Sequence, residues 1–138
     1  MEAANLVKEL QLNDSGKLLV MFECAKEARV NMDETEVDAM AFLLNAKQAL
    51  PFGYPFLLNP LPVSSELRQD VYNLIQTGYL SKGSPVYITR KGSDWVSVLL
   101  QRVDDRSGLL SALKEMMAEL IAEYRRAAFG LIYTAISG

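Results

Sequence analysis

The sequence predicts a mainly α fold with a small β-hairpin (α+β), of the winged helix-turn-helix type, with a long C-terminal helix. Three observations predict it. Two helical apolar patterns precede Pro51, a capped helix near residue 70 ends at a glycine and runs into a hairpin, and a long amphipathic segment closes the chain. A helix, a glycine stop and a tight two-stranded hairpin form the order in which a winged helix ends.

The length and composition fit one domain. The chain has 138 residues, of which 50% are hydrophobic, and this is enough to bury a single core. We expect a winged-helix domain over residues 1–106, with its core at 17–103. Residues 107–138 are expected to form a C-terminal helix of the same domain that acts as its dimerisation element.

The first two helices are predicted from the spacing of apolar residues. Over residues 17–30, after a turn-like segment at 13–16, apolar side chains recur at helical intervals. Asp33 and Glu36 have capping-box spacing, and the following pattern indicates a helix over about 34–50. The proline-rich residues 52–62 are expected to form a connector with at most a short edge strand.

The third helix and the hairpin are predicted from capping and turn residues. Ser64 or Ser65 can cap the helix, and Gly78 supplies a left-handed stop. Residues 79–89 alternate well enough for two short strands turned at 82–85, which is the predicted wing. A fourth helix is expected after Thr89 as its cap, ending at the polar turn 104–108.

The last segment, residues 109–135, predicts one long helix and a dimer interface. A helix of about 27 residues is roughly 40 Å long, which exceeds the core of a small domain. Part of its wide apolar face should therefore contact a second subunit or cover another groove, and we expect the second subunit. The predicted interface residues are Leu110, Leu113, Met117, Ile121, Tyr124, Ala128 and Ile132.

Outward polar residues of the third helix and cations near the hairpin are the candidate DNA contacts. Glutamine and asparagine can bond adenine edges in a major groove, and cations can bind phosphates. A merely solvated helix face is the competing interpretation, because Glu66 and Asp70 flank the same helix. The candidate residues are Ser65, Arg68, Gln69, Asn73, Lys82, Arg90 and Lys91.

The composition argues against several other classes of function. The formal charge of −3 argues against wholesale phosphate binding, so any nucleic-acid surface must be local. The chain has no histidine, one cysteine and no glycine-rich phosphate loop, so we expect no enzymatic activity, catalytic residue, cofactor or metal site. Cys24 is interpreted as a packing residue. With no secretion signal visible and the apolar run 127–136 too short to span a bilayer, we expect a cytoplasmic protein without membrane contact.

Five short motifs occur in a defined order along the chain. They are Phe-Leu-Leu-Asn-Ala-Lys at 42–47, Gly-Tyr-Pro-Phe at 53–56, Pro-Val-Ser-Ser-Glu-Leu at 62–67, Gly-Tyr-Leu at 78–80 and Ile-Thr-Arg-Lys-Gly at 88–92. This order resembles the YwgA-like and SocA/Panacea-type prokaryotic domains. The likeness covers about residues 36–96, although Leu61-Pro62-Val63 replaces the usual Tyr-Gly-Pro-like turn. The resemblance implies a small prokaryotic domain used in regulation, toxin–antitoxin control or phage-linked systems.

Two functions remain open from the sequence. The first is a prokaryotic transcriptional regulator that binds double-stranded DNA as a homodimer, with the third helix in the groove and the wing on phosphate. The alternative is a non-enzymatic protein-interaction module, antitoxin-like or an adaptor, on the same fold. The expected partners are thus DNA, a second copy of the chain, or another protein.

Overall fold

The computed structural model describes residues 12–102 and 106–137. The described residues form helices and two short antiparallel hairpins, so the predicted class, mainly α with a small β-hairpin and a long C-terminal helix, is confirmed. The order of α2, α3, α4 and the β3–β4 hairpin is the order predicted for a winged helix. The elements are α2 Asp14–Glu27, α3 Glu34–Ala46, β1 Leu57–Leu58, β2 Pro62–Val63, α4 Ser65–Gln76, β3 Leu80–Ser81, β4 Tyr87–Ile88, α5 Arg90–Leu100 and α6 Arg106–Ser137.

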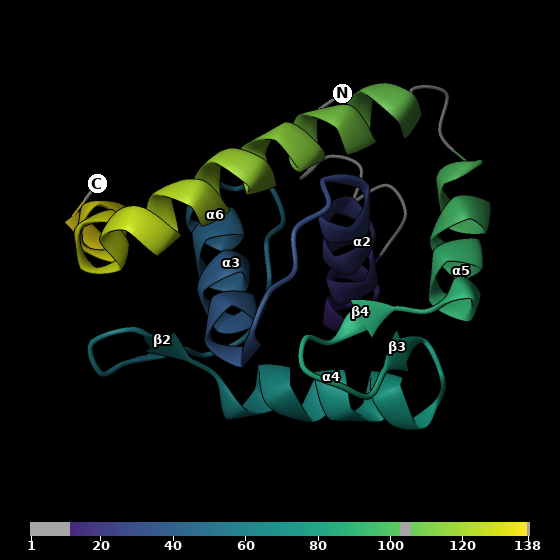
Figure 1. Cartoon of the computed structure of the whole chain (residues 1–138), viewed down its shortest axis with the longest axis horizontal. Helices are drawn as coiled ribbons and strands as arrows, with labels where there is room; N and C mark the ends of the chain where they lie inside the picture. The colour runs from purple at the N-terminus through teal and green to yellow at the C-terminus, as the bar shows by residue number, and fades with distance from the viewer. Residues whose placement is uncertain (1–11, 103–105, 138) are drawn as a thin grey trace.

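Helix α2 is the centre of the molecule. Every residue from Leu18 to Ala25 is buried, because α6, α5, α4 and β4 pack around this helix. Figure 1 shows α6 crossing α2 and α3 on one side, while α4 runs along the opposite side. The core therefore lies between α6 and α4, and α4 keeps one face toward solvent.

Side-chain caps fix the starts of the first two helices. The Asn13 side chain accepts a hydrogen bond from the Gly16 backbone N–H (2.8 Å), so α2 begins at Asp14, three residues before the predicted start. Asp33 and Glu36 form the predicted capping box at the start of α3. This helix ends at Ala46 rather than near residue 50, because Gln48 takes a left-handed conformation with φ 58°.

The third helix and the wing match the prediction closely. Ser64 caps α4, and Gly78 follows it in a left-handed conformation with φ 85°. Strands β3 and β4 pair antiparallel around residues 82–86, and Thr89 caps α5 by accepting from the Gly92 backbone N–H (3.2 Å). A side chain at Gly92 would overlap the carbonyl oxygen of Tyr79, so only glycine lets α5 approach the wing this closely.

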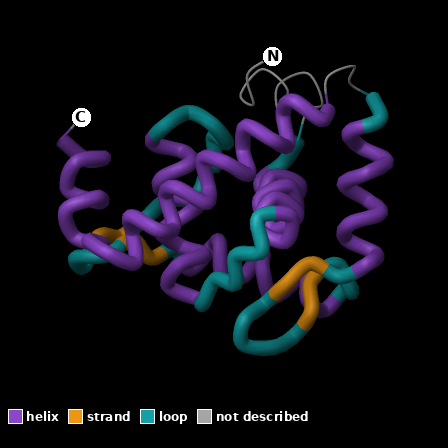
Figure 2. The backbone as a smooth tube through the Cα atoms, turned by 45° about the horizontal axis from the view of Figure 1, so that its top comes forward, coloured by secondary structure: helices purple, strands orange, loops and turns teal. Residues whose placement is uncertain are grey.

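Two segments differ in detail from the expected connector and turn. The proline-rich connector contains a second hairpin, in which Leu57 pairs with Val63 and Leu58 with Pro62. Helix α5 ends at Leu100, and the acidic part of the turn predicted after it lies outside the described residues. Figure 2 shows the β1–β2 hairpin near the C-terminal end of α6, apart from the β3–β4 hairpin beside α5.

Helix α6 is bent rather than continuous. Ala127 has non-helical backbone angles (φ −151°, ψ 61°), which divide the predicted single helix into two pieces. Alanine is the strongest helix former, so local propensity does not produce this break. With the bend in place, Tyr124 before it and Ile132 after it are both buried in the core.

The apolar stripe predicted as a dimer interface packs inside the chain. Its central residues are at most 6% exposed, because α2 and α3 together are wide enough to cover them. Leu110 and Ala128 are partly buried against the same core. The stripe is therefore part of the protein's own core, and other residues must supply any contact with a second subunit. The buried members are Leu113, Met117, Ile121, Tyr124 and Ile132.

Among the described residues, none of the helices has the length and apolar character needed to cross a membrane.

Candidate nucleic-acid interface

The outer face of α4 is polar and exposed, as predicted. Leu67 and Leu74 are buried on its inner side, which turns Ser65, Gln69 and Asn73 toward solvent. The Gln69 amide nitrogen donates to the Asn73 side-chain oxygen (3.0 Å). These two amides thus lie side by side, with donors and acceptors on a surface that a base edge could approach.

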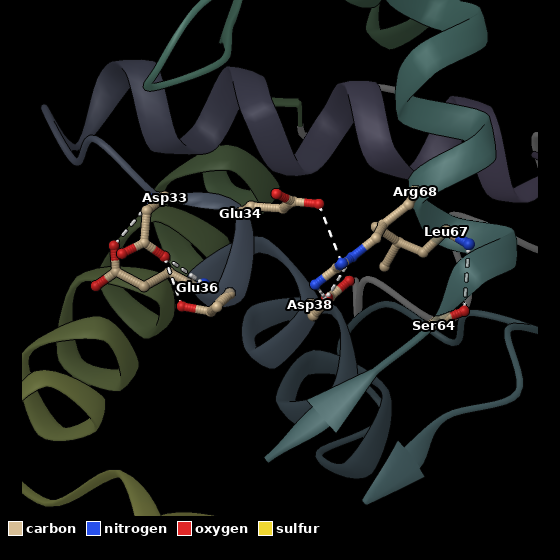
Figure 3. Close-up of polar contacts among 8 residues, drawn as sticks. Asp33, Glu34, Glu36, Asp38, Ser64, Leu67 and Arg68 are labelled. Atoms are coloured by element: carbon tan, nitrogen blue, oxygen red, sulfur yellow. Dashed lines mark hydrogen bonds and ion pairs between the residues drawn. The ribbon is translucent and has the colours of Figure 1, made fainter. Parts of the chain in front are cut away.

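Arg68 does not share this outward direction. Figure 3 shows its side chain reaching α3, where Nε and Nη2 donate to Oδ2 of Asp38 (3.1 and 2.8 Å) and Nη1 lies 3.1 Å from Glu34. The physical reason is that Asp38 is fully buried, and a buried carboxylate needs a paired charge. The structure therefore separates Arg68 from the other candidate DNA contacts.

Burial and ion pairing shift the pKa of the Asp38 carboxyl in opposite directions. Burial raises its pKa above the ordinary value, while the hydrogen bonds and charge of Arg68, and more weakly the Ser64 backbone N–H, oppose the rise. Within the part of the chain that the structure describes, its Oδ1 atom has no hydrogen-bond partner. The carboxylate thus depends on Arg68, and Arg68 is held in place by it.

Of the three predicted cations near the hairpin, Lys91 contacts the C-terminal end of α4, and Lys82 and Arg90 are exposed. Lys91 donates to the Thr77 carbonyl oxygen (2.7 Å), and its ammonium group lies 4.4 Å from the centre of the Tyr79 ring. The Arg90 side chain is 95% exposed and only 4.0 Å from Asp94, and Lys82 is exposed at the hairpin tip. Lysine at a helix C-terminus is electrostatically favourable, and here it also carries positive charge to the polar face of α4.

A groove separates α4 from the hairpin tip. Its volume is about 380 Å³, and apolar side chains of α2, α3 and α4 form most of it. Tyr72 lines the groove and is 55% exposed. The polar side chains of the lining are Asp33, Glu34, Asp38, Arg68 and Ser84. The groove is thus bounded by the helix and the hairpin that carry the candidate contacts.

Two polar contacts that position the site were not predicted. Arg125 donates to Glu36 (2.6 Å from Nε) and to the Asn31 carbonyl oxygen. The Tyr54 hydroxyl donates to Asp70 (2.6 Å), and burial together with this hydrogen bond raises the Tyr54 pKa. Neither pair has a local sequence signal, because the partners lie far apart in the chain.

Cys24 behaves as a packing residue. Its side chain is fully buried, and burial raises the pKa of its thiol to about 12, with Glu23 and Glu27 adding to the rise. A thiol in that state is not a nucleophile at neutral pH. Within residues 12–102 and 106–137, no cluster of three or more Asp, Glu or Cys side chains could hold a metal ion.

Comparisons with known proteins add no relative. No family model matches the sequence, and no significant match was found among curated proteins or solved structures. The likeness to the YwgA-like and SocA/Panacea-type domains stays a prediction.

Proposed function

We propose that this protein is a winged-helix DNA-binding protein, a prokaryotic transcriptional regulator that acts as a homodimer. The observation that carries the proposal is the outer face of α4, which is polar, exposed and bordered by Lys82, Arg90 and Lys91. In helix-turn-helix proteins the second helix enters the major groove, and here Lys82 on the hairpin with Arg90 and Lys91 at the start of α5 would contact the flanking phosphates.

The residues divide into two roles. Gln69 and Asn73, with Ser65 beside the helix start, bond base edges, and on binding the two amides exchange their mutual hydrogen bond for bonds to a base. Lys82, Arg90 and Lys91 bind phosphates. Arg68 acts indirectly, because its pair with Asp38 sets how α4 sits on the core.

The charge available sets the expected salt dependence. Three phosphate contacts give a log–log salt slope of about −3 for one subunit and about −6 for a dimer. Because the chain carries a net charge of −3, repulsion between protein and DNA opposes these contacts. Two subunits on one site are therefore needed for specific binding at physiological salt.

A salt titration of duplex binding tests the phosphate contacts. The variant Lys82→Ala/Arg90→Ala/Lys91→Ala should lose about three units of salt slope per subunit. The matched control removes three exposed cations away from α4, in the variant Lys47→Ala/Lys114→Ala/Arg126→Ala, and should keep the wild-type slope. Equal slopes for the two triple variants would refute the wing role.

Sequence readout needs a separate test. A preferred site is selected from a random duplex pool with the wild-type protein, and binding to this site is compared with binding to scrambled duplex. The variant Gln69→Ala/Asn73→Ala should lose about 1–3 kcal/mol of discrimination per lost base contact but keep its salt slope. If the variant still distinguishes the selected site from scrambled duplex as well as the wild type does, α4 does not read the DNA sequence.

A second candidate, a non-enzymatic antitoxin-like or adaptor module, is favoured by the groove between α4 and the hairpin tip. Its apolar lining suits side chains of a partner protein, and Tyr72 stands at its rim. In this case Tyr72→Ser should weaken a purified complex with that partner, while Gln69→Ala should not. Duplex binding that survives physiological salt with a site preference would instead favour the DNA-binding function.

A further inference from the structure

Exposed large apolar side chains gather at one end of the molecule. Nine such side chains are exposed among the described residues, and six of them come from the β1–β2 hairpin and from α6 beyond its bend. Figures 1 and 2 both place these two segments at the same end. We call this the end surface, and its residues are Leu57, Leu58, Val63, Phe129, Tyr133 and Ile136.

The end surface is free of charge. Residues 127–137 and 57–63 contain no lysine, arginine, aspartate or glutamate, whereas α6 before its bend carries several of each sign. A strongly charged partner would find no complementary charge here. Two copies of this chain, each with a net charge of −3, meet with least repulsion across such a neutral surface.

The bent part of α6 carries a ridge and a furrow side by side. Phe129 and Tyr133 are four residues apart and 65% and 71% exposed, which makes them a ridge. Gly130 and Thr134 form the adjacent row, and a Cβ atom at Gly130 would meet nothing within 4 Å. The Thr134 hydroxyl donates to the Gly130 carbonyl oxygen (2.9 Å), so this row offers no free hydroxyl donor.

A ridge beside a furrow on one helix is self-complementary. Rows of side chains spaced by four residues pack into the matching grooves of another helix at a crossing angle of about −50°. Glycine weakens an exposed helix relative to alanine, and the close approach of a second backbone is a use that compensates for this weakness. The same arrangement on two copies therefore lets each ridge enter the other's furrow around a two-fold axis.

We propose that the end surface is the interface between two copies of this chain, with the two α6 helices crossing at Gly130. The hairpin residues Leu57 and Val63, which lie opposite each other on paired strands, then cover the edge of the contact. This interface takes the place of the buried stripe. It rests on the homodimer of the proposed function but not on the DNA contacts.

Sedimentation equilibrium of the full chain without DNA tests the interface. The wild type should be dimeric at micromolar concentration, and Phe129→Ser/Tyr133→Ser should raise the dimer dissociation constant by at least about 100-fold. The matched control, Tyr87→Ser/Val98→Ser, removes two similarly exposed apolar side chains elsewhere and should remain dimeric. A monomeric wild type, or equal dissociation constants for both variants, would overturn the proposal.

Gly130→Leu tests the crossing point independently of surface hydrophobicity. Leucine favours a helix more than glycine does, so this variant should be folded and no less stable as a monomer. Its side chain fills the furrow, so the dimer dissociation constant should rise about 10-fold or more. An unchanged dimer in Gly130→Leu would overturn the proposed crossing.

The interface and the proposed function can fail separately. A dimer that depends on Phe129 and Tyr133 but binds no duplex at any salt concentration supports the interface and ends the DNA-binding proposal. If the protein binds duplex but neither variant changes its oligomeric state, the result supports DNA binding and refutes the interface.

Discussion

Two pairs of cations in this chain behave in opposite ways. Arg68 and Arg125 both turn inward to the first turns of α3, where they pair with Asp38 and Glu36 over sequence separations of 30 and 89 residues. Lys82 and Arg90 instead extend into solvent near the end of α4. The first group holds helices together, and the second is free to meet another molecule.

The difference shows why overall charge is a poor guide to the surface of this protein. The acidic cluster at the start of α3, residues 33–38, is the counter-charge for two arginines from α4 and α6. Acidic residues are also favourable at a helix N-terminus. The four acidic residues of this cluster exceed its two arginines by two charges, so this region accounts for much of the net charge of −3, and the corner around Lys82, Arg90 and Lys91 is more positive than the total suggests.

Removing the Arg68 guanidinium should have the largest effect on stability. Arg68→Met leaves Asp38 buried and unpaired, and should lower the free energy of unfolding by about 2–3 kcal/mol, less than for a fully buried pair because solvent reaches part of Arg68. Urea unfolding at pH 7 measures it. Arg68→Met/Asp38→Leu should recover much of the loss, and a single variant as stable as wild type would show that the pair does not hold α4.

The same variant should depend on pH in a defined direction. Without Arg68, the Asp38 pKa rises further above its ordinary value of 3.8, so the folded state binds a proton at a pH where the unfolded state does not. Stability of Arg68→Met therefore increases as pH falls through the folded pKa toward 3.8. A flat difference from wild type between pH 7 and pH 4 would contradict this.

Arg125→Met should cost less than Arg68→Met. Arg125 is half-exposed and Glu36 keeps its capping bond to the Asp33 backbone N–H, so we expect a loss of about 1 kcal/mol. Thermal unfolding measures the change. The control Arg126→Met removes the neighbouring exposed arginine and should be nearly neutral, and a similar loss in both variants would show that Glu36 is not the reason.

Lys91 stands between the two groups and should show a small effect on both properties. Lys91→Met removes a hydrogen bond to the end of α4 and a cation over Tyr79, which should lower stability by about 0.5–1 kcal/mol. The variant should also lose about one unit of salt slope in duplex binding. Stability is compared with that of Lys114→Met, which changes an exposed lysine on α6.

The outward cations should matter least for stability. Lys82→Ala/Arg90→Ala should change the free energy of unfolding by no more than about 0.5 kcal/mol. Chemical denaturation of this variant and of Arg68→Met under the same conditions compares the two losses of stability. A loss above 1 kcal/mol would place these cations with the inward group.

Local signals were sufficient for most of the fold. The capping box at Asp33, the cap at Ser64, the left-handed Gly78 and the cap at Thr89 each depend on residues within a few positions, so the sequence predicted them. The outward residues of α4 follow from the same helical spacing. Asn13 was missed as a cap because it is part of a run that also reads as a turn.

Contacts between residues far apart in the sequence could not be predicted from these local signals. Helical spacing identified the apolar stripe of α6 but not what covers it, because Leu113 and Ile121 look the same against a second subunit as against α2 and α3. The bend at Ala127 and the partners of Arg68 and Arg125 also depend on tertiary contacts. The candidate site was therefore predicted by residue type and direction, except for the arginine whose partner lies in another helix.

Helix α4 is held at both ends by contacts that do not involve its outward side chains. Ser64 and the pair of Arg68 with Asp38 hold the beginning of the helix, and Lys91 holds its end. None of these contacts uses Ser65, Gln69 or Asn73. Substitutions at these outward positions should therefore leave the fold intact, because the contacts that hold α4 on the core are made by other residues.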